Sequence, residues 1–102
     1  MHILSMKALR DYWETYKGAD QVALEQALKS WYREVKNAQW STANEIKDKY
    51  RSASILKNGR VVFNICGNKF RLIVGVNYKL KTVYVKWVGT HADYDGINAE
   101  EV

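Results

Sequence analysis

Hydrophobic residues recur at helical spacing through the first third of the chain. After Ser5, an apolar or aromatic side chain returns every three or four positions until Gly18 interrupts the pattern: Met6, Leu9, Trp13 and Tyr16. This spacing gives one face of a helix an apolar stripe, and Ser5 is suited to cap its first turn. A second stripe is formed by Leu24, Ala27, Leu28, Trp31 and Val35. It predicts a second helix over residues 20–37 that Asp20 caps, with its tryptophan in the core.

The hydrophobic pattern changes to alternation in the second half of the chain. Three segments rich in Val, Ile, Phe and Tyr predict consecutive β-strands: residues 60–66, 69–77 and 82–88. Gly67-Asn68 favours a tight turn between the first two strands, and a looser turn joins the last two. This succession predicts an antiparallel meander.

The segment between the helices and the strands carries shorter signals. Ser41 or Thr42, together with Glu45, can cap a short helix over residues 44–50. Residues 54–56 predict a short edge strand, and Asn58-Gly59 after them is a strong hairpin signal. Helices followed by a meander predict one α+β domain over residues 1–102, with the two N-terminal helices packed on one face of a small antiparallel sheet.

Alternation also divides the strand residues between two faces of the sheet. We expect the helices to cover the more apolar set: Val61, Phe63, Ile65, Phe70, Leu72, Val74, Val76, Val83, Val85 and Trp87. The opposite face would then display Asn64, Lys69, Arg71, Tyr84 and Lys86. Cations beside an aromatic ring on a sheet face can pair with phosphates and stack a base, although Lys and Tyr are equally common on an ordinary solvated face.

The charge of the chain agrees with a polyanionic partner without identifying one. Sixteen Lys and Arg against eleven Asp and Glu give a net charge of +5, and such a basic domain attracts RNA, DNA or an acidic protein alike. The single cysteine, Cys66, cannot form an internal disulfide, which favours a reducing cytoplasm. We interpret Cys66 as a partly buried structural thiol. The sequence contains no run typical of a membrane span or a signal peptide.

The loop expected after the last strand carries the candidate chemistry. It contains His91 and Tyr94, with Asp93 and Asp95 beside them. An imidazole can take or give a proton near neutral pH, a phenol can donate one, and Arg or Lys can neutralise a phosphorane; together these groups suit cleavage of RNA by its own 2′-hydroxyl. Two alternatives remain open, a metal site made by His91 and the two aspartates, and a purely packing role for His91.

Two segments resemble the HigB-type toxins of bacterial type II toxin–antitoxin modules, a branch of the RelE-like superfamily. They read VVFNICGNKFRLIV and VYVKWVGTHADYD, and the upstream segment LKSWYREVKNAQWSTANEIKDKY is also similar to that family. The resemblance covers nearly the whole chain, and the FNxxGNKxRLxV and THxxYD elements are specific in combination. It implies a ribonuclease that cuts mRNA without a metal or other cofactor, often on the ribosome. It also implies a HigA-type antitoxin with a helix-turn-helix domain.

The resemblance assigns roles to individual residues. It implies that Arg71 is the phosphate-stabilising cation and that His91 and Tyr94 have acid–base or base-stacking roles. Asn64, Asn68 and Lys69 match the FNxxGNK element, which implies that they shape the turn or hold RNA. Lys86 and Tyr84 enter as RNA-binding candidates from the face argument alone. The alternative function is a non-catalytic module whose basic face binds RNA or an acidic protein.

Overall fold

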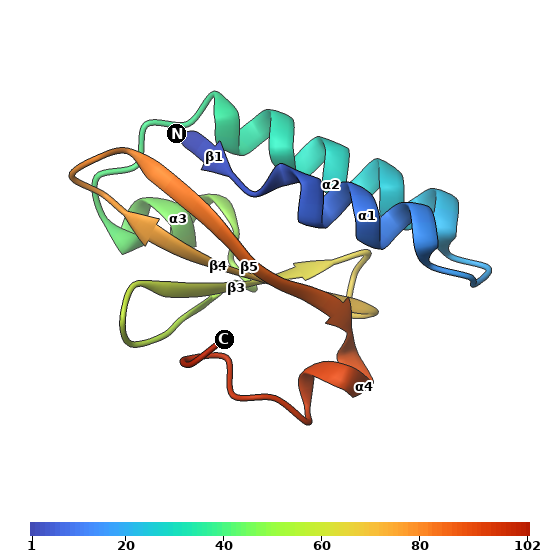
Figure 1. The fold of residues 1–102 in the computed structure, drawn as a ribbon. Helices are drawn as coiled ribbons and strands as arrows, with labels where there is room; N and C mark the ends of the chain where they lie inside the picture. The colour runs from blue at the N-terminus through green and yellow to red at the C-terminus, as the bar shows by residue number, and fades with distance from the viewer.

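The computed structural model describes all of residues 1–102 and has the predicted α+β arrangement (Figure 1). Two helices, α1 (Met6–Thr15) and α2 (Gln21–Lys36), lie side by side over one face of the sheet, as expected. The predicted third helix is α3 (Ala43–Lys49), which Thr42 and Glu45 cap reciprocally. None of these helices combines the length and the apolar character needed to cross a membrane.

The two long helices begin without the side-chain caps that the sequence suggested. Ser5 has a left-handed backbone, with φ of 69°, and makes no capping hydrogen bond. Asp20 makes none either, and its carboxylate lies 2.8 Å from the ammonium nitrogen of Lys69. Ser5 and Asp20 occupy the predicted N-cap positions, but neither side chain caps its helix, so burial of the apolar stripes stabilises α1 and α2.

Five strands form one sheet in the order β1-β5-β4-β3-β2. The predicted strands are present and pair antiparallel: β2 (Ser54–Ile55), β3 (Arg60–Ile65), β4 (Phe70–Asn77) and β5 (Thr82–Thr90). The sequence did not reveal β1 (His2–Leu4), which lies parallel to β5. Three residues carry too little pattern to predict a strand, and the pairing partner of β1 is near the other end of the chain.

The sheet separates two hydrophobic clusters of unequal size. The large cluster fills the space between the sheet and the helices, and its strand members confirm the predicted inward face with the exception of Trp87. The small cluster lies on the opposite face, where Val62 and Ile73 pack against Ala99. Figure 1 shows the C-terminal segment (residues 95–102) running back beneath the sheet, on the side away from the helices. The face expected to be open is therefore partly covered.

A β-bulge explains why Trp87 departs from the prediction. Trp87 pairs with Ile73, but the next residue of β4, Val74, pairs with Val85, so Lys86 is an extra residue on β5. The extra residue shifts the alternation, and Trp87 packs with the small cluster instead of beneath the helices. Alternation read from the sequence has no means of detecting such an insertion.

Candidate active site

Arg71 is held in a fixed position on β4. The residue is 9% exposed, and its Nη1 donates hydrogen bonds to the carbonyl oxygens of Asn68 and Phe70 at 3.1 and 3.2 Å. Its Nη2 donates to Oδ1 of Asn68 at 2.8 Å. No carboxylate forms a salt bridge with Arg71. A nearly buried guanidinium without a counter-charge is suited to an anionic ligand, because a buried cation is stable only when its charge is balanced.

His91 and Tyr94 lie on a single helical turn, α4 (His91–Tyr94), where the sequence predicted a loop. The hydroxyl of Thr90 caps this turn by accepting a backbone hydrogen bond at 3.1 Å. The N–H of His91 donates to the carbonyl oxygen of Lys69 at 2.9 Å, which ties α4 to the turn between β3 and β4. As a result, the guanidinium carbon of Arg71 lies 5.8 Å from the centre of the Tyr94 ring.

The three predicted catalytic residues therefore gather at one end of the sheet. The imidazole Nε2 of His91 lies 3.7 Å from Oδ1 of Asp95, and 44% of the His91 side chain is exposed. An accessible imidazole can exchange protons, and a guanidinium beside a phenol ring can bind an anion. An imidazole, a phenol and a guanidinium thus lie at one end of the sheet.

Four of the five predicted RNA-binding residues belong to this side of the structure. They are Asn64, opposite Arg71 in the sheet, Asn68 in the adjacent turn, and Tyr84 and Lys86 farther along β5. Lys69 does not share the face of Arg71, because it precedes β4 in the turn and its ammonium group pairs with Asp20 between the helices. This hydrogen bond raises the pKa of Lys69. The face assignment of Lys69 is wrong.

Trp87 also lies beside the candidate site, although the sequence did not point to it. Its ring centre lies 6.3 Å from that of Tyr94, with 49° between the ring planes. The indole folds over Gly89, where a Cβ atom would meet it at 2.5 Å. The signal in the sequence is a glycine two positions after the tryptophan, since residues at that spacing share a face of a strand. Trp87, Tyr94 and Arg71 together form an aromatic and cationic surface that can stack a base.

Neither a metal centre nor a cysteine nucleophile fits the geometry. His91 approaches Asp95, yet no group of three His, Cys, Asp or Glu side chains in the chain is arranged to hold a metal ion. Burial, followed by the charge of Asp20, raises the pKa of the Cys66 thiol. A thiol held in its protonated form is a poor nucleophile, in agreement with a structural role for Cys66.

Comparisons with known proteins identify the family of this chain. Residues 24–97 match the HigB toxin family, described as the RelE-like toxic component of a toxin–antitoxin system. The chain belongs to this family. An mRNA interferase HigB of Escherichia coli O6:H1 is 31% identical over 97 residues, which cover 93% of this chain and 89% of that relative. The mRNA interferase toxin HigB of Escherichia coli K12 is 28% identical over 103 residues, with 97% and 92% of the two chains covered.

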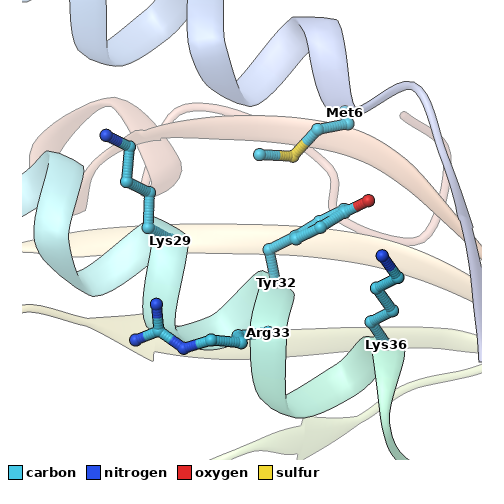
Figure 2. A pocket seen from close by; sticks show the side chains of 5 residues that line it. All are labelled: Met6, Lys29, Tyr32, Arg33 and Lys36. Carbon is cyan, nitrogen blue, oxygen red and sulfur yellow. The ribbon is translucent and has the colours of Figure 1, made fainter.

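This HigB-family chain also has a groove on its helical side, away from the candidate active site. The groove has a volume of about 300 Å³ and lies between the start of α1 and the second half of α2. Figure 2 shows its lining, in which Met6 and Tyr32 face each other and three cationic side chains surround them: Lys29, Arg33 and Lys36. No His, Cys, Asp or Glu lines this groove, so it suits binding of an acidic group and not acid–base chemistry.

Proposed function

We propose that this chain is an mRNA interferase toxin, an endoribonuclease that cleaves mRNA and so inhibits translation and growth. Its membership of the HigB toxin family and the names of its relatives support this function. The single observation that carries the proposal in the structure is the guanidinium of Arg71 over the ring of Tyr94, with His91 on the same helical turn.

The proposed reaction needs no group from outside the protein and the RNA. His91 takes the proton of a ribose 2′-hydroxyl, and the 2′-oxygen attacks the adjacent phosphorus atom. The bond from phosphorus to the 5′-oxygen breaks, and the hydroxyl of Tyr94 donates a proton to that leaving oxygen. The products are a 2′,3′-cyclic phosphate and a 5′-hydroxyl. Arg71 stabilises the extra negative charge of the phosphorane, which is where a preorganised cation lowers the barrier most.

We further propose that the partners are mRNA on the ribosome and a HigA-type antitoxin with a helix-turn-helix domain. A toxin of this family acts within a toxin–antitoxin system, which supports an antitoxin partner. The net charge of +5 supports a contact with RNA.

Expression in bacteria, combined with mapping of RNA 5′ ends on translating ribosomes, tests the function. The wild-type chain should arrest growth and generate new 5′ ends, and Arg71→Ala should abolish both effects. Arg10→Ala, at an exposed position of α1, is the matched control and should remain toxic. Because Arg71 also holds the β3–β4 turn, Tyr94→Phe, which keeps the ring and removes only the hydroxyl, should lower the cleavage rate without unfolding the protein.

Two results would contradict the proposal in different ways. RNA binding without new 5′ ends, in an experiment that includes ribosomes, would favour the non-catalytic binding module. Full toxicity of both Arg71→Ala and His91→Ala would leave the ribonuclease function in place but show that the catalytic residues are assigned wrongly.

A further inference from the structure

A pair of cations, Arg60 and Lys86, lies on the face of the candidate active site, away from Arg71. Arg60 of β3 and Tyr84 of β5 flank Gly75 of β4 in the sheet. A Cβ atom on Gly75 would lie 3.2 Å from Nη1 of Arg60 and 3.3 Å from Cε of Lys86. The two cationic side chains therefore converge over the glycine from opposite neighbouring strands.

No Asp or Glu side chain balances these two charges. Neither Arg60 nor Lys86 takes part in a salt bridge. The only hydrogen bond of the Arg60 side chain runs from Nη2 to the backbone oxygen of Val102, at 2.7 Å, and its Nε is buried without a partner. Lys86 lies 5.6 Å from the centre of the Tyr84 ring. Two like charges brought close together without an acidic side chain between them favour the binding of an anion, so this arrangement suits a phosphate.

The bulge in β5 creates this arrangement and sets its position. Lys86 is the extra residue of the bulge, and Trp87 follows it on the same side of the sheet. Counted along β4, Gly75 is four residues from Arg71, which corresponds to about 13 Å. Trp87 pairs with Ile73, the residue midway between them. Arg71, Trp87 and the Arg60–Lys86 pair therefore follow one another along one line on the sheet.

We propose that Arg60 and Lys86 form a second phosphate site, which holds the RNA backbone a short distance from the cleaved phosphodiester. RNA on this line would place its scissile phosphate at Arg71, stack a base on Trp87, and bring a further phosphate between the guanidinium of Arg60 and the ammonium group of Lys86. The inference rests on the proposed ribonuclease function and adds to it the direction in which the substrate crosses the sheet. The second site contributes to binding and takes no part in bond cleavage.

Single uncharged phosphates test the second site directly. A series of mRNA oligonucleotides, each with one methylphosphonate linkage at a different distance from the cleavage position, is bound to ribosomes and cleaved by the toxin. With wild-type protein, one linkage away from the cleavage position should raise KM about tenfold and leave kcat unchanged, the effect of losing one charged hydrogen-bonded contact. Lys86→Gln should show a higher KM with the unmodified oligonucleotide and a smaller further increase from the methylphosphonate than the wild type, because Arg60 remains.

Control variants separate this effect from a general loss of charge. Lys17→Gln and Arg10→Gln change exposed cations on the helical side, and both should retain the wild-type response to the neutral linkage. Arg60→Gln repeats the test on the other cation. Because this variant also loses the hydrogen bond to Val102 and could unfold the C-terminal segment, Lys86→Gln provides an independent test. The proposal is wrong if Lys86→Gln and Arg60→Gln respond to each linkage as the wild type does, or if only the cleaved phosphate is sensitive.

A failure of the proposed ribonuclease function would give a different result from a failure of the second phosphate site. If wild-type protein cleaves none of these RNAs, the ribonuclease assignment fails. Fluorescence anisotropy with the same oligonucleotides then tests the second site, because the neutral linkage should weaken binding to the wild type more than binding to Lys86→Gln. Equal weakening of binding in both proteins would overturn the second site.

Discussion

A single methyl group at Gly89 should disturb the candidate active site without removing any of its chemical groups. A Cβ atom there would meet Cη2 and Cζ2 of Trp87 at 2.5 and 2.6 Å, well inside normal contact distance. The indole cannot simply rotate away, because it packs beside Tyr94 and against the small cluster around Ile73. Overpacking of this kind costs about 1–3 kcal/mol, and we expect Gly89→Ala to lower the free energy of unfolding by that amount.

Displacement of the Trp87 indole should also lower the rate of RNA cleavage. Moving the indole alters its contact with Tyr94, whose ring lies beneath the guanidinium of Arg71. Because a misplacement of about 1 Å can lower a rate up to a hundredfold, Gly89→Ala should reduce cleavage of ribosome-bound mRNA by about tenfold or more. A change in tryptophan fluorescence should accompany it.

Urea denaturation and RNA cleavage, measured on three variants, test this reasoning. Gly96→Ala is the matched control, since its Cβ would lie 3.5 Å from the nearest atom, an ordinary contact, and it should behave like the wild type. In the background of Trp87→Ala, which removes the indole, Gly89→Ala should cost little further stability. If Gly89→Ala is as stable as Gly96→Ala, or if its cost is unchanged without the indole, the indole does not occupy the space above Gly89.

Three further predictions concern other contacts. Thr42→Ala removes the side-chain cap of α3 and should lower the free energy of unfolding in urea by about 1 kcal/mol. Burial, together with the hydrogen bond to Glu34, raises the pKa of Tyr50. The folded state therefore favours the neutral phenol, stability should fall as the pH rises above about 10, and Tyr50→Phe should make this alkaline loss smaller in thermal unfolding. Asn68→Ala removes the acceptor for Nη2 of Arg71 and should lower kcat about tenfold with little change in KM.

Each of these predictions has a result that would contradict it. A stability of Thr42→Ala equal to that of the wild type would mean that the cap contributes nothing. An unchanged alkaline transition in Tyr50→Phe would assign the pH dependence to other groups. Asn44→Ala, exposed on α3, is the control for the asparagine variant; equal kcat values for the two variants would show that Asn68 does not position Arg71.

Local patterns in the sequence were sufficient to place most of the secondary structure. The helical spacing at Leu24, Leu28 and Val35 and the alternation at Phe70, Leu72 and Val74 report burial on one side of an element, and these residues are buried as predicted. The capping pair of α3 and the Asn58-Gly59 turn, with φ of 59° and 70°, depend only on neighbouring residues. Such features are local, so the sequence is enough to find them.

The sequence also pointed to Arg71, His91 and Tyr94, mostly through the resemblance to a family. Alternation alone placed Arg71 on the correct face, opposite Asn64. It could not show that Asn68 anchors the guanidinium or that Tyr94 lies beneath it, because these contacts join different elements.

By itself, then, the sequence determined the fold class, the order of the main elements and the family, because each depends on short-range patterns or on motifs that can be read residue by residue. Only the tertiary structure decided which side chains share the site. One extra residue in β5 moved Trp87 to the candidate active face and, through Lys86, brought a second cation to Arg60. Lys69, in the turn before β4, pairs with Asp20 instead of facing the candidate active site, and the C-terminal segment covers part of a face expected to be open. Strand register and long-range packing depend on the whole chain, so a pattern within one segment does not predict them.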